Sequence, residues 1–183
     1  MKVGLITPQG WKLEYEGWDP ARAWANTVEL ARQAEDLGFE SLWAFDHFTT
    51  VPEPKDEMTL ESFTHLSAIA MATQNVRLGH MVICTAFRNP ALTAKLASTI
   101  DVISNGRFEI GIGAGWKEDE WIAYGYGFPP IGERISTFAE HLEVISRMIA
   151  PGRATYEGER VHVLDAINEP RSIQPKIPLI VGG

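Results

Sequence analysis

The stretch Ser41-Leu42-Trp43-Ala44-Phe45-Asp46-His47 joins a short apolar run to two polar residues. The run predicts a buried strand, and Asp46-His47 stands where that strand meets its loop. Arg88-Asn89 and Gly113-Ala114-Gly115-Trp116 stand at the ends of two further apolar runs. In an open nucleotide-binding sheet the phosphate loop usually follows the first strand, but residues 7–11 contain no glycine cluster. Functional residues at several strand ends are typical of a (β/α)8 barrel mouth, so we prefer a barrel to a doubly wound sheet.

Strands and helices alternate along the whole chain, which indicates an α/β fold with a parallel sheet and helical cover. The first four strands begin roughly 30 to 40 residues apart, as expected for βα units. A full barrel needs about 250 residues, so we expect the N-terminal portion of one, truncated after about five strands. The predicted strands, side by side in chain order, are residues 3–7, 41–45, 77–83, 108–113 and 178–182, and the predicted helices are residues 22–37, 60–73, 90–105 and 133–149.

Two segments interrupt this alternation. Residues 115–132 are rich in Trp, Tyr, Gly and Pro and are too long for a plain connection, which is typical of a binding loop or lid. Residues 154–164 have the pattern of a small β-hairpin. We place both segments within a single domain covering residues 1–183.

Charge and composition exclude several classes of partner. The net charge is −8 and the 16 Lys and Arg residues are scattered, so nucleic acid is not expected as a partner. No apolar run approaches the roughly 18 residues of a membrane span. The single cysteine, Cys84, permits no internal disulfide and fits a reducing compartment. We therefore expect a cytoplasmic protein.

Several motifs occur together in one order along the chain. They are residues 34–43 (AEDLGFESLW), 46–48 (DHF), 77–79 (RLG), 88–95 (RNPALTAK), 104–108 (SNGRF), 111–116 (GIGAGW), 124–125 (YG) and 178–183 (PLIVGG). In this order the chain resembles the luciferase-like monooxygenase family, in particular the branch that uses the deazaflavin coenzyme F420.

The resemblance implies an oxidoreductase that transfers a hydride between F420 and a small organic substrate, with the redox chemistry supplied by the coenzyme. An FMN-dependent monooxygenase supplied by a separate reductase is the nearest alternative. A non-catalytic truncated paralogue or scaffold is the alternative from another class. Family members commonly dimerise, so a homodimer is expected.

The resemblance also implies the site residues. His47 is expected beside the coenzyme ring as the residue that handles a proton, and Asp46 is expected to contact the coenzyme. A non-prolyl cis peptide is expected at Met81-Val82, in a bulge behind the ring. The residues expected to converge on one concavity are Asp46, His47, Met81, Val82, Cys84, Ala114, Gly115 and Trp116.

Each of these features has a purely structural alternative. A histidine after a strand can simply bond a loop carbonyl, and Met81-Val82 can be ordinary core. For Gly111, Gly113 and Gly115 we prefer close approach to a flat ring over tight strand packing. Trp116 can stack on a ligand or cap the core.

Other polar residues are weaker candidates. We expect Glu120 to be solvated or to orient the loop, and we expect His65 and His141 on helices that wrap the outside. His80 can point inward or into a helix interface. No grouping has metal-ligand spacing, so no metal is expected. Similar sugar-phosphate dehydrogenases have a glutamate at the position of Trp116, which disfavours glucose-6-phosphate as substrate.

The last expectation concerns the open sides of an incomplete barrel. Two sheet edges and an apolar lumen would be exposed, and such surfaces favour association. The family's phosphate-binding helix N-terminus would follow Gly182-Gly183. We therefore expect residues 1–183 alone not to form a soluble coenzyme-binding monomer.

Overall fold

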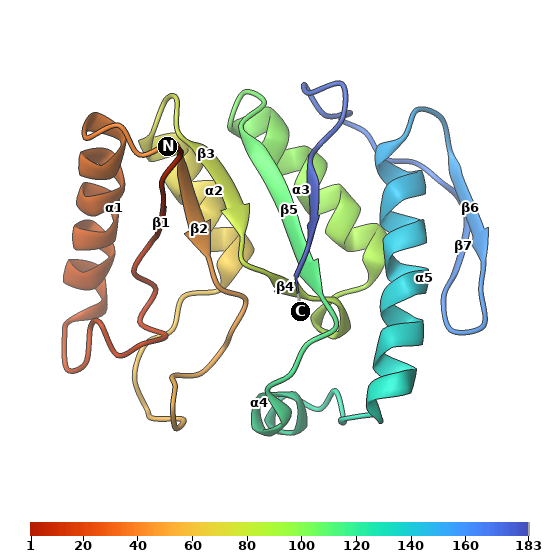
Figure 1. The fold of residues 1–183 in the computed structure, drawn as a ribbon, viewed down its shortest axis with the longest axis horizontal. Coiled ribbons are helices and arrows are strands. Elements are labelled where there is room, and N and C mark those ends of the chain that lie inside the picture. The colour runs from red at the N-terminus through yellow and green to blue at the C-terminus, as the bar shows by residue number, and fades with distance from the viewer. Residues whose placement is uncertain (183) are drawn as a thin grey trace.

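The fold was determined as a computed structural model that describes residues 1–182; Gly183, the last residue of the predicted closing motif, lies outside the described residues. Its main sheet contains parallel strands in the order of the chain (Figure 1). β5 lies between β3 and β4 on one side and β8 on the other, because Ile112 pairs with both Ile83 and Val181. The strands are β1 (Gly4–Ile6), β2 (Ser41–Ala44), β3 (Arg77–His80), β4 (Ile83–Cys84), β5 (Phe108–Gly113) and β8 (Leu179–Val181).

This order confirms the barrel and excludes the doubly wound alternative, in which the first strand is central. β1 pairs only with β2 among the described residues and so forms one edge of the sheet. β3 and β4 together form the strand predicted at residues 77–83, which a bulge at Met81-Val82 divides in two.

Side-chain caps begin three of the helices. The side chain of Asn89 accepts hydrogen bonds from the amides of Ala91 and Leu92, with Pro90 in the first turn. Asp19 and Glu61 cap the two preceding helices in the same way. The helices are α1 (Pro20–Asp36), α2 (Ser62–Ala72), α3 (Pro90–Ile103), α4 (Glu118–Ala123) and α5 (Ile131–Ile149), with a 3-10 turn η1 at Thr85–Phe87.

The core lies between the sheet and these helices. Every second strand residue points toward the helices, because successive side chains of a strand point to opposite faces of the sheet. The residues fully buried on this face include Leu42, Leu78, Phe108 and Ile112. Burial of each such side chain contributes about 1.5–3 kcal/mol. The helix predicted to reach residue 37 ends one residue earlier, because Leu37 is the exposed C-cap residue of α1.

The opposite face of the sheet is the side that becomes the lumen of a barrel. Ile6 and Ile180 point to this face and are partly exposed. Trp43 covers its centre, because a Cβ atom added at Gly79 would lie 2.5 Å from the Trp43 ring. The tight packing of Trp43 therefore requires glycine at position 79.

All strands run in one direction, so their carboxyl ends meet at one end of the sheet, the lower end in Figure 1. α4 lies at this end, within the long segment 115–132, and was not predicted as a helix. Beyond α5, β6 (Ala154–Glu157) and β7 (His162–Ala166) form an antiparallel hairpin beside that helix.

Candidate functional site

One cavity of about 750 Å³ lies at the carboxyl ends of the strands. Its wall includes residues from the end of β2, from the bulge between β3 and β4, and from the loop after β5. The structure brings together in this wall all eight residues expected to converge, namely Asp46, His47, Met81, Val82, Cys84, Ala114, Gly115 and Trp116.

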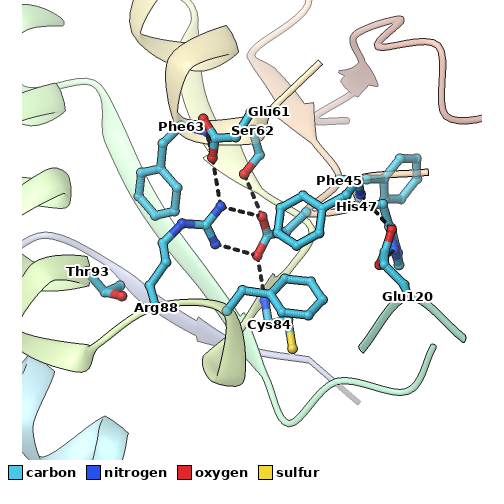
Figure 2. Close-up of polar contacts among 12 residues, drawn as sticks. Phe45, His47, Glu61, Ser62, Phe63, Cys84, Arg88, Thr93 and Glu120 are labelled. Carbon is cyan, nitrogen blue, oxygen red and sulfur yellow. Dashed lines mark hydrogen bonds and ion pairs between the residues drawn. The ribbon is translucent and has the colours of Figure 1, made fainter. Parts of the chain in front are cut away.

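Asp46 is buried, and its carboxylate is occupied by partners within the protein. Arg88 donates to both carboxylate oxygens at 2.8 Å, as Figure 2 shows. The Ser62 hydroxyl and the Cys84 backbone amide each donate at 2.8 Å. These donors use most of the carboxylate's acceptor capacity within the protein. Contact of Asp46 with a coenzyme stays a prediction.

Arg88 is held from several sides. It also donates to Glu61 at 2.7 Å, and its guanidinium lies 4.6 Å from the centre of the Phe63 ring. Burial would lower the pKa of Arg88, but the bonds to Asp46 and Glu61 outweigh burial and raise it. The Arg88 guanidinium therefore stays charged, and its pair with Asp46 ties the end of β2 to the residue that follows η1.

His47, the next residue, faces the cavity. Its Nδ1 lies 2.8 Å from a carboxylate oxygen of Glu120 (Figure 2). The imidazole stacks on Trp11 with ring centres 4.5 Å apart, and Trp116 meets it edge-on at 5.7 Å. Two aromatic rings and one carboxylate thus hold the His47 ring in place.

Glu120, which we expected to be solvated or to orient the loop, is also part of the site. It is buried on α4 and also accepts the backbone amides of Phe48 at 2.6 Å and Thr49 at 3.0 Å. Burial alone would raise the pKa of Glu120, but the bonds from His47 and these amides outweigh it and lower the pKa. Glu120 is thus a carboxylate, Nδ1 of His47 carries the proton of their bond, and Nε2 is left for the cavity.

The bulge between β3 and β4 presents Met81 and Val82 to the cavity, and their peptide bond is cis, as expected. The glycines of β5 are explained by this bulge. A Cβ at Gly111 would lie 1.9 Å from the carbonyl oxygen of His80, and one at Gly113 would lie 2.9 Å from Val82. Tight packing against the segment from β3 to β4 therefore requires both glycines. The approach of these glycines to a flat ring stays a prediction.

The loop after β5 packs closely on β4. Gly115 has φ +78°, and a Cβ there would lie 2.5 Å from the sulfur of Cys84. Burial raises the pKa of Cys84 to about 12, so this thiol is neutral. Trp116 is 65% exposed, so it lines the cavity and does not cap the core.

His65, His80 and His141 are buried, whereas His162 of the hairpin is exposed. His65 and His141 lie on the outer helices α2 and α5, as expected. Both side chains face the protein interior, and His65 bonds the Thr7 hydroxyl at 2.7 Å. His80 lies between the rings of Phe63 and Phe108, in the helix interface.

Within residues 1–182, no three His, Cys, Asp or Glu side chains gather as metal ligands would. No helix among these residues has the length and apolar character needed to cross a membrane.

Five successive parallel strands with a cavity at their carboxyl ends define a (β/α)8-barrel protein whose site lies at the barrel mouth. The profile described as luciferase-like monooxygenase matches residues 1–183, and the chain belongs to that family of oxidoreductases.

Relatives with different chemistry are similar to the chain. An F420-dependent glucose-6-phosphate dehydrogenase of Kineococcus radiotolerans is 32% identical over 94% of the chain and 49% of its own length. Pyrimidine monooxygenase RutA of Acinetobacter baylyi is 27% identical over the whole chain and 51% of its own length. The oxygenating constituent of 3,6-diketocamphane monooxygenase of Pseudomonas putida, solved with FMN, has the same fold (TM-score 0.78, 20% identity, 99% of the chain and 51% of that protein). The chain thus spans about half the length of the curated relatives it matches.

Proposed function

We propose that the chain carries the ring-binding and proton-transfer part of an F420-dependent oxidoreductase, which transfers a hydride between the deazaflavin and a small organic substrate. The observation that carries this proposal is the pair of His47 and the buried Glu120, with 2.8 Å between their bonded atoms, on the wall of the cavity. The similarity to an F420-dependent dehydrogenase supports the choice of coenzyme.

The cavity suits a flat heteroaromatic ring. Its volume of about 750 Å³ lies in the range of ligand pockets, about 300–1,000 Å³. Met81 and Trp116 expose large apolar surfaces into it. When bound, the deazaflavin would supply the acceptor or donor of the hydride; Met81, Val82 and Trp116 are the residues that would hold its ring.

His47 is the proton-handling residue in this proposal. Nε2 is the free nitrogen, so it accepts a proton from a substrate hydroxyl, or returns one to a carbonyl oxygen in the reverse direction. Glu120 fixes the ring through Nδ1 and stabilises the imidazolium that forms. Asp46 positions this histidine by anchoring the preceding backbone to Arg88 and Cys84.

Titration of the purified full-length protein with F420 and, separately, with FMN tests the coenzyme. We expect F420 to bind at least about tenfold tighter, and Trp116→Ala to weaken binding by about tenfold through loss of an aromatic contact. Trp18→Ala is the matched control, since Trp18 is also partly exposed but lies outside the cavity wall. Tighter binding of FMN would favour the monooxygenase alternative, which the pyrimidine monooxygenase relative supports. Absence of binding to either coenzyme would favour the non-catalytic scaffold.

The ring nitrogens of His47 test the proton-transfer role. In the ¹⁵N NMR spectrum at about pH 8 we expect Nδ1 to be protonated and Nε2 to be unprotonated. Glu120→Gln should mix the two tautomers, because an amide can accept or donate, whereas Glu118→Gln on the same helix should not. A predominant Nε2–H tautomer in the unmodified protein would contradict the assignment.

The proposal also includes a cytoplasmic homodimer as the working form. Cys84, the single cysteine, suits a reducing compartment, and the family resemblance supports dimerisation. The mass of the protein in solution, measured over a range of concentrations, tests the dimer.

A further inference from the structure

The outer wall of the cavity is apolar along one helix face. Ile131, Ile135 and Phe138 follow at spacings of four and three on the first turns of α5, so they share one side of the helix. All three line the cavity, yet Ile131 is 60% and Ile135 is 51% exposed. Large apolar side chains that face a cavity and remain uncovered offer a contact surface for an apolar ligand.

The charged groups of the cavity wall are already paired within the protein. Asp46 is bound by Arg88, and Glu120 is bound by His47. The ammonium of Lys117 lies 2.6 Å from Asp119, and the Lys117 side chain is buried. Among the cavity-lining residues that the structure describes, each charged side chain therefore has its own partner. A charged ligand group placed here would lose hydration without gaining a counter-ion, which is strongly unfavourable.

We infer that the substrate is an uncharged molecule with an apolar body and one hydroxyl or carbonyl oxygen. This inference rests on the proposed function, because the oxygen is the group that meets Nε2 of His47. The apolar body lies against Ile131, Ile135 and Phe138, and Ile135, as the middle residue of this wall, selects for neutral chains. We expect phosphorylated and carboxylated compounds to bind more weakly, because each cation among the described lining residues is already paired.

Calorimetric titration with 2-pentanone, 2-heptanone and 2-nonanone tests the apolar surface. The dissociation constant should fall about three- to fourfold with each added methylene. 8-Oxononanoate, which adds a carboxylate to the same ketone skeleton, should bind at least about tenfold more weakly than 2-nonanone. Equal affinity for the two nine-carbon compounds, or no gain with chain length, would overturn the inference.

A charge introduced into the wall gives a second and independent readout. Ile135→Lys should weaken 2-nonanone and strengthen 8-oxononanoate, so that their order of affinity reverses. Leu164→Lys is the matched control, since Leu164 is an exposed apolar residue of β7 outside the cavity wall, and it should change neither affinity. Unchanged affinities in Ile135→Lys would also overturn the inference.

Each titration is run with the protein alone and again with F420 or FMN present, so that the two proposals fail separately. If neither coenzyme binds but the ketone series behaves as expected, the coenzyme assignment is wrong and the class of ligand stands. If F420 binds but the ketones show no dependence on length or charge in either condition, the substrate class is wrong and the coenzyme assignment stands.

Discussion

Replacing Arg88 by methionine should destabilise the protein far more than the loss of a surface ion pair does. Methionine keeps an apolar stem against Phe63 but removes the charge. Asp46 then loses two charge-assisted bonds at 2.8 Å and keeps only the Ser62 hydroxyl and the Cys84 amide. The carboxylate remains buried without a counter-ion.

The expected cost follows from that burial. The Arg88 and Asp46 side chains are only 11% and 1% exposed, so solvent screens their interaction little. Removing one partner of such a pair costs about 3–5 kcal/mol. With a urea m-value of about 2–3 kcal/mol per molar, the unfolding midpoint should fall by roughly 1–2 M.

Urea unfolding followed by circular dichroism measures this shift. Arg153→Met is the control, because the Arg153–Asp165 pair has side chains 57% and 62% exposed, and its loss should cost less than about 1 kcal/mol. The loss of stability in the double variant Asp46→Asn/Arg88→Met should be smaller than the summed losses of the two single variants. The difference should be roughly 1–3 kcal/mol. If Arg88→Met loses no more than the Arg153 control, Arg88 does not neutralise a buried charge and the positioning role of Asp46 fails.

Other predictions follow from burial and close packing. Burial lowers the pKa of both His65 and His80 to about 4 from 6.5, so below pH 6.5 the unfolded chain binds more protons. Stability should therefore fall as the pH drops from 6.5 to 4, by roughly 3 kcal/mol per histidine. Urea unfolding measured across this pH range gives the free energy of unfolding at each pH. If that free energy depends on pH in His80→Phe as steeply as in the unmodified protein, the prediction is contradicted. Gly111→Ala should lower stability by about 1–3 kcal/mol through overpacking. Gly132→Ala is the control, because a Cβ atom there would meet nothing within 4 Å. Equal urea midpoints for the two variants would refute the packing argument. Burial raises the pKa of Cys84 to about 12. Iodoacetamide at about pH 8 should therefore alkylate this thiol at least about a hundredfold more slowly in the native protein than in the urea-unfolded protein. Similar rates would show that the native protein has an accessible thiolate.

The fold was largely predictable because its signals are local. Capping residues such as Asn89-Pro90 and apolar runs such as that of β2 act within a few residues and are readable in the chain. α4 was missed because its six residues are too short for a helical period. It is held by tertiary contacts, above all by Glu120, whose partner His47 lies 73 positions earlier in the chain.

The site was predictable in position but not in the direction of its side chains. Proximity to strand ends placed Asp46 and His47 at the mouth, and the structure has both in the cavity wall. Which side chain turns inward depends on Arg88 and Glu120, which approach from distant segments. An acid in a polar loop is usually solvated, so residue type alone gave no reason to expect a buried Glu120. The spacing Trp116-x-x-x-Glu120 is the one signal that could have indicated it, since it places both residues at the same loop entrance.

The two buried carboxylates of the cavity wall differ in the partner that neutralises them, and this difference separates their roles. Asp46 faces a guanidinium, which stays protonated at any pH at which the protein is folded. This pair cannot exchange a proton and can only hold backbone in place. Glu120 faces an imidazole, and in the proposed function the other nitrogen of that ring exchanges a proton with the substrate. In the proposed function, the acid at the end of β2 therefore serves structure and the acid on α4 serves chemistry, and the imidazole partner, not the acid, identifies the proposed site of proton transfer.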